Sequence, residues 1–182
     1  MDVNELLKNW HDRRAEDYER FKRCFPESDD LLAIVLRGHL LVEEHIDRLN
    51  RHCLNYPEYY DQAKFNFGKK LLLAKALILV PYADRDEFFG PIERLNELRN
   101  NLAHNLESAK LKNKILEFIA AVEKERKAVE KESKIKEESE GEFTIEKRTR
   151  NAIAFILGQM VVLDIVVEFM EKSRAYGANN KE

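Results

Sequence analysis

The sequence predicts an all-α protein, folded as an up-and-down bundle of about five to six helices. Apolar residues recur at intervals of about 3.6 residues over long segments, as they do on the buried face of a helix. Only 6 glycines and 4 prolines interrupt the chain, too few for the frequent turns of an all-β protein. The 182 residues, of which 44% are hydrophobic and 36% charged, are enough for one core under a charged surface. We therefore expect a single domain over residues 1–182.

The two helices nearest the amino terminus are predicted from their end signals. The first covers residues 3–25 and is closed by Pro26, and we expect the segment 1–26 to lie at the periphery of the bundle. A serine and two aspartates indicate the start of the second helix, which covers residues 31–54. Gly38 falls within its apolar stripe, where a glycine weakens the helix but allows another helix to pack closely.

The remaining helices follow from the same periodicity and from prolines. They are predicted over residues 65–80, from about 84 or 89 to 104, over 106–131 and over 144–176. Residues 56–63 are interpreted as an aromatic connector around Pro57, and Asn105 as a hinge or cap. The run 131–142 is rich in both charges, and we interpret it as a solvated helix tip and loop.

The last predicted helix contains an apolar block long enough to raise the question of a membrane span. Gln159, Asp164 and Glu168 interrupt this block, and two carboxylates one turn apart are costly in lipid. We therefore expect no membrane insertion, and predict a helix buried at the centre of the bundle or in a subunit interface. A homodimer is the expected assembly.

Charge and composition limit which cellular locations and which binding partners are expected. With 31 Lys and Arg against 34 Asp and Glu, the formal net charge is -3, so any contact with RNA must be local. No secretory signal is evident at the amino terminus, and free cysteines suit a reducing compartment, which predicts a cytoplasmic location. His45 and His52 are too widely spaced on one helix to ligate one ion, and no glycine-rich phosphate loop is present. We expect neither a metal nor a cofactor.

The most informative segment is Glu97-Leu98-Arg99-Asn100-Asn101-Leu102-Ala103-His104, at the end of a predicted helix. Arg99, Asn100 and His104 combine a permanent bidentate cation, a neutral amide and a group that titrates near neutral pH, which suits phosphodiester chemistry. Helical geometry places Asn100 and His104 on one face, above Glu93 and Glu97. Arg99 falls roughly 140° from His104, beside the apolar stripe, and is expected to point along a helix seam, where it needs a partner.

A purely structural interpretation of the same residues stays open. A histidine in the last turn of a helix interacts favourably with the carbonyl end of the helix dipole, and asparagines are common near helix ends. Arg99 would then pair with a buried acid, for which Glu43, Asp164 and Glu168 are candidates.

Arg-x4-His is the signature of the HEPN superfamily, which the chain resembles over roughly residues 28–175. The likeness is carried by LRGHLLVEEHIDRLN at 36–50, by the apolar segment 65–79 and by RLNELRNNLAHNLE at 94–107. The chain also resembles the branch that includes mannitol operon repressor-type proteins. The resemblance implies a helical bundle that dimerises so that two Arg-to-His motifs face each other across the interface.

The resemblance further implies a metal-independent endoribonuclease of toxin or phage-defence type, which acts by transesterification at the RNA 2′-hydroxyl. Two copies of His104 would be the acid and the base, Arg99 would hold the phosphate, and Asn100 would orient the phosphate or the histidine. Glu97 would favour the protonated histidine, and Glu43, on the helix where family members often carry an acid, would aim Arg99.

Two other functions remain open at the level of sequence. One is a non-catalytic regulatory or protein-binding bundle, such as a mannitol repressor-like transcriptional regulator. The other is a dimer that binds a nucleotide or other small ligand between its helices. An antitoxin or regulatory protein is a candidate partner, but Leu106 stands where one family arrangement has a tyrosine, so regulation by modification of that tyrosine is not expected.

Overall fold

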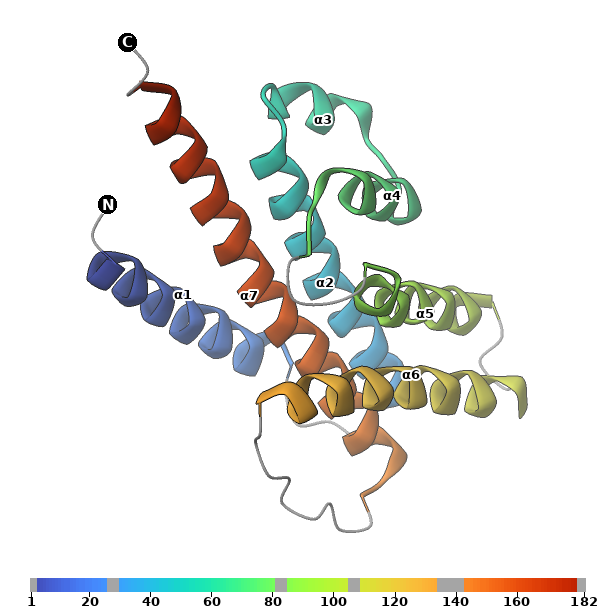
Figure 1. Ribbon diagram of the computed structural model, residues 1–182. Coiled ribbons are helices and arrows are strands. Elements are labelled where there is room, and N and C mark those ends of the chain that lie inside the picture. The colour runs from blue at the N-terminus through green and yellow to red at the C-terminus, as the bar shows by residue number, and fades with distance from the viewer. Residues whose placement is uncertain (1–2, 26–29, 81–84, 105–108, 134–142, 180–182) are drawn as a thin grey trace.

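The computed structural model describes residues 3–25, 30–80, 85–104, 109–133 and 143–179. These residues form seven helices and no strand, so the prediction of an all-α bundle is confirmed (Figure 1). The helices are α1 (Val3–Cys24), α2 (Leu31–Cys53), α3 (Pro57–Ala63), α4 (Phe67–Leu77), α5 (Arg85–His104), α6 (Ala109–Ser133) and α7 (Ile145–Asn179). The predicted hinge at Asn105 and the charged loop over 134–142 lie outside the described residues.

The helix count exceeds the expected five to six because the predicted connector 56–63 is itself a helix, α3. Pro57 stands in its first turn, where the fixed φ of proline suits a helix and its missing N–H is not needed. Lys64 ends the helix in the left-handed conformation, with φ of 48°. The next helix, α4, begins only at Phe67, because the side chain of Asn66 accepts a hydrogen bond from the backbone N–H of Lys69.

The core is built around α2. One side of this helix packs along α7, the other side contacts α4 and α5, and α6 lies against both α5 and α7 (Figure 1). Most buried side chains of α2 and α7 are apolar, as the predicted stripe requires, and the buried polar ones are His39, His45, Asn50, Thr149 and Asp164. The apolar ones include Val35, Val42, Ile46 and Leu49 of α2, and Ile153, Ile156, Met160 and Leu163 of α7.

Gly38 lies at a tight crossing of α2 and α7, as a glycine within the apolar stripe predicted. A Cβ atom on this residue would lie 2.7 Å from both Cδ1 and Cγ2 of Ile153, a side chain with no exposed surface. These two atoms lie on different branches of the isoleucine, so a change of one rotamer does not clear the space. The glycine is therefore explained by the helix crossing alone.

The segment Ile145–Met170 of α7 contains an 18-residue window with a mean hydropathy of 2.1 and is, among the described residues, the one helical stretch long and apolar enough to cross a membrane. A core helix of a globular domain meets the same criteria. Contacts with α2 and α6 and the burial of Asp164 against His45 fit the interpretation of α7 as a core helix.

Described side chains in the carboxyl-terminal half of the first helix contact the bundle. Phe21 stacks on the buried Phe25, with ring centroids 4.9 Å apart, and Arg20 forms an ion pair with Glu44 of α2. Asp17 lies 3.6 Å from the guanidinium of Arg48. Figure 1 shows α1 diverging from α7 toward the amino terminus.

Candidate functional site

The motif helix α5 is fixed by its apolar stripe. Ile92, Leu95, Leu98 and Leu102 are all buried, which confirms the stripe expected from the sequence. Glu93, Glu97 and Asn100 are exposed on the outer face of the helix. The core thus fixes the rotation of the helix about its axis, so that Arg99, Asn100 and Asn101 of the motif face solvent.

Arg99 is exposed, so the prediction that it points along a helix seam is wrong. Its Nη1 donates a hydrogen bond of 2.9 Å to Oδ1 of Asn100. Within the described part of the chain Arg99 has no acidic partner. The Cα atom lies at the edge of the stripe, and the long side chain carries the guanidinium outward, where water solvates it.

His104 is the last residue of α5, and its side chain lies outside the described residues. The predicted contact between Glu97 and His104 therefore stays a prediction. The carbonyl of Glu97 accepts a hydrogen bond of 2.7 Å from Nδ2 of Asn101. Glu93, one turn earlier, has its carboxylate 3.0 Å from Nζ of Lys75 on α4.

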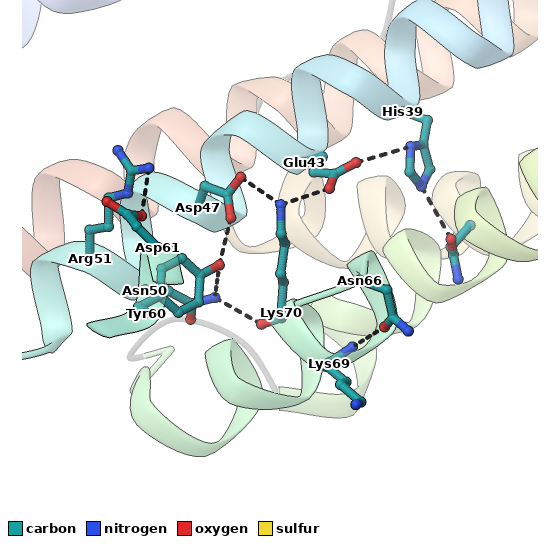
Figure 2. A network of polar contacts seen from close by, with 11 residues as sticks. His39, Glu43, Asp47, Asn50, Arg51, Tyr60, Asp61, Asn66, Lys69 and Lys70 are labelled. Atoms are coloured by element: carbon teal, nitrogen blue, oxygen red, sulfur yellow. Dashed lines mark hydrogen bonds and ion pairs between the residues drawn. The ribbon is translucent and has the colours of Figure 1, made fainter. Parts of the chain in front are cut away.

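Glu43 does not contact Arg99, so its expected role as the residue that aims the arginine is not supported. Its carboxylate lies 2.8 Å from Nζ of Lys70 and 3.9 Å from Nδ1 of His39 (Figure 2). His39 and Glu43 are one turn apart on α2, a spacing that brings side chains together on one face of a helix.

Lys70 is the centre of a polar cluster that sequence reasoning missed. Its ammonium lies 2.8 Å from both Glu43 and Asp47 of α2, and Tyr60 Oη donates a hydrogen bond of 2.5 Å to Asp47 (Figure 2). Nδ2 of the buried Asn50 donates to the Lys70 carbonyl at 2.9 Å. Burial, reinforced by the hydrogen bond to Asp47, raises the pKa of Tyr60 to about 12. The cluster fastens α3 and α4 to α2; the one signal in the sequence is the pair of carboxylates one turn apart.

His39 connects α2 to the motif helix. Its ring is 2% exposed, its Nε2 lies 3.2 Å from Oδ1 of Asn96 on α5, and it packs against Phe67 with ring centroids 4.3 Å apart. Since an amide oxygen only accepts, Nε2 carries the proton of this hydrogen bond. Burial lowers the pKa of His39, against the effects of Asn96 and Glu43, and the positive charge of Arg99 lowers it further. The charge of Arg99 thus affects the pKa of a histidine that links α2 to α5.

The lowered pKa of His39 predicts acid sensitivity. The unfolded chain binds a proton near the ordinary pKa of 6.5, whereas the folded chain does so only at a lower pH. Stability from the neutral ring is therefore complete above pH 6.5 and is lost as the pH falls through the lowered pKa. We expect the free energy of unfolding, measured in urea between pH 8 and 5, to fall less steeply in His39→Gln than in wild type. Equal slopes would contradict a neutral, buried His39.

No family model, curated protein or solved structure matches this chain. The HEPN resemblance thus depends on the spacing from Arg99 to His104 and on the helices around it. In the described ranges no group of three or more histidine, cysteine or acidic side chains is placed to hold a metal ion. His45, considered above as a ligand, instead has its Nδ1 2.8 Å from Oδ2 of Asp164.

The motif surface can bind an anion through Arg99. A guanidinium presents five N–H donors, and the bond to Asn100 uses a neutral acceptor, so the positive charge is held without being neutralised. The arrangement is suited to a phosphate group that reaches α5 from solvent or from a second protomer.

Proposed function

We propose that this protein is a metal-independent endoribonuclease of the HEPN type, which acts as a cytoplasmic homodimer. The observation that supports this most directly is the exposed guanidinium of Arg99, braced by Asn100 and free of any acidic partner among the described residues. This geometry disfavours the structural alternative in which Arg99 neutralises Glu43, Asp164 or Glu168.

The proposed reaction is an internal transesterification. One His104 takes the proton of an RNA 2′-hydroxyl as the 2′-oxygen bonds to the adjacent phosphorus. The bond from phosphorus to the 5′-oxygen breaks, and the second His104, from the other protomer, gives its proton to that leaving oxygen. The products are a 2′,3′-cyclic phosphate and a 5′-hydroxyl. Arg99 binds the non-bridging oxygens, where negative charge builds up in the transition state.

Asn100 has a positioning role in this proposal. Its Oδ1 accepts from Nη1 of Arg99 and restricts a long side chain that would otherwise sample many rotamers on an exposed helix face. The Nδ2 group is left to donate to phosphate or to His104. Glu97, exposed about two turns before His104, would favour the protonated form of a histidine that comes near it.

RNA cleavage by the purified protein in EDTA tests the proposal. We expect single-stranded RNA to be cut, and Arg99→Ala and His104→Ala to slow cleavage about 100-fold or more, since each removes a transition-state contact. Asn100→Ala is expected to have a smaller effect, about tenfold, because it acts through Arg99. The matched control is Arg94→Ala, which removes an equally exposed arginine from the same helix and is expected to cut RNA at the wild-type rate.

Two results would overturn the proposal. One is intact RNA at micromolar concentrations of a folded dimer. The other is a protein that stays monomeric at those concentrations, because a composite site needs both protomers. In cells, expression is expected to arrest growth, and His104→Ala to relieve the arrest.

A protein-binding role is the second candidate, favoured by a specific observation on α3 and α4. Large apolar side chains are exposed there, with Leu72 65%, Tyr59 67% and Tyr56 67% accessible. Exposed apolar side chains gathered on one region are typical of interaction surfaces. As a regulatory bundle, the protein would leave RNA intact, and its complex with an antitoxin or other protein would form equally well with His104→Ala.

A further inference from the structure

A cavity lies between α1, α2 and α7, on the side of α2 that faces away from Lys70. Its volume is about 780 Å³, within the range of small-molecule sites in proteins. The wall is largely apolar, and its aromatic and aliphatic side chains come from all three helices: Phe21, Leu41, Phe155, Leu157, Val161 and Val162. An apolar ligand would bury most of its surface here.

His45 gives this largely apolar cavity a buried polar contact point. Its side chain is 8% exposed, yet it lines the cavity. Nδ1 lies 2.8 Å from Oδ2 of Asp164, and since a carboxylate only accepts, Nδ1 carries a proton. The same carboxylate oxygen lies 3.4 Å from Nη1 of Arg48, so the ring is held from behind. Nε2 has no hydrogen-bond partner in the described part of the chain, and in the neutral ring it is an acceptor.

Gly158, in the middle of α7, also lines the cavity. A glycine at such a position costs about 1 kcal/mol of helix stability relative to alanine. Unlike Gly38, it is not explained by packing, because a Cβ atom here would meet nothing within 4 Å. Because Gly158 has no side chain, the backbone of α7 is accessible at this point to a ligand in the cavity.

The charges around the cavity disfavour an anion. Two carboxylates, Asp17 and Glu44, are in the lining. Two described cations near them are already matched, since Arg20 pairs with Glu44, and Arg48 lies between Asp17 and Asp164. A carboxylate ligand would add a negative charge beside these groups, whereas an uncharged ligand adds none.

We propose that this cavity binds an uncharged, largely aromatic small molecule that donates one O–H or N–H hydrogen bond to Nε2 of His45. The site uses the face of α2 that carries Leu41 and His45, whereas the polar cluster and α5 lie on the face that carries His39 and Glu43. The proposal therefore stands or falls independently of ribonuclease activity.

Three probes of one shape test the proposal on the full-length protein: 2-naphthol, naphthalene and 2-naphthoate. We expect calorimetric or fluorescence titration to show 2-naphthol bound about tenfold more tightly than naphthalene, the ratio that one added hydrogen bond to a buried acceptor gives. The anionic 2-naphthoate is expected to bind most weakly. Equal affinities for 2-naphthol and naphthalene would overturn the role of His45, and preferred binding of 2-naphthoate would overturn the choice of an uncharged ligand.

Variants at two positions separate the site from nonspecific binding. His45→Phe is expected to remove the preference for 2-naphthol over naphthalene. Gly158→Leu fills the cavity from a backbone position where nothing is displaced, and is expected to abolish binding of both probes, whereas Gly158→Ala retains it. The glycine pair remains informative if His45→Phe does not fold. Unchanged binding in Gly158→Leu would overturn the location of the binding site in this cavity. If the wild-type dimer binds no probe and Gly158→Leu is monomeric, a second copy of the chain occupies the cavity and the small-molecule proposal is overturned.

Discussion

Replacement of Gly38 by leucine is expected to lower the free energy of unfolding by about 3 kcal/mol or more, the upper end of the effect of overpacking a core. The first carbon of the new side chain would already lie 2.7 Å from two atoms of Ile153, which is itself without exposed surface. Relief requires α2 and α7 to separate, and these helices form the most extensive contact in the fold. Urea unfolding followed by circular dichroism measures the change.

Two further variants show whether the loss comes from this contact. Gly158→Ala adds a methyl group to a helical glycine with open space around it, and is expected to stabilise the protein by about 0.5–1 kcal/mol. Gly38→Ala is expected to be destabilising alone and to be partly rescued by Ile153→Ala, which removes the atoms it meets. A stable Gly38→Leu variant, or equal effects of alanine at positions 38 and 158, would contradict the proposed crossing.

Helices with a long regular stripe were predicted well from the sequence. The observed ends of α2 and α5 lie within about one residue of the predicted ends, taking residue 84 as the predicted start of α5. The prediction succeeds here because apolar periodicity and capping residues act locally. The aromatic segment of α3 is too short to show a period, and its helix depends on Tyr60 being buried against α2. A contact of that kind is not written in the local sequence.

The candidate site was predictable as a set of residues but not as a set of partners. Spacing placed Asn100 on the solvent side of α5, and the structure agrees. Spacing does not decide which cation approaches a given acid: Lys70, 27 positions from Glu43, took the place that the sequence suggested for Arg99. The contact between His45 and Asp164 spans 119 positions. From the sequence alone, His45 was considered only as a metal ligand, and Asp164 was considered as an ionic partner only for Arg99.

The contact between His45 and Asp164 is the basis of the second prediction with a large effect on stability. Asp164→Leu is expected to lower the free energy of unfolding by about 3–5 kcal/mol, as does the loss of one partner from other buried pairs. Asp164 is 3% exposed and, within the described part of the chain, makes the one hydrogen bond to the His45 ring, so the variant leaves Nδ1 buried and unsatisfied. The loss of Asp164 costs Arg48 less stabilisation, because its side chain is 32% exposed to water and keeps Asp17 as a partner.

The double variant decides whether the loss reflects the pair or the packing of α7. His45→Phe alone leaves a buried carboxylate with only Arg48 beside it, and is expected to be destabilising as well. Combined with Asp164→Leu, it places two apolar side chains of similar volume where the polar pair stood, and the double variant is expected to be more stable than either single one. Additive losses in urea unfolding would show that the two residues act separately, and that the contact between α2 and α7 at this level is held by its aliphatic neighbours alone.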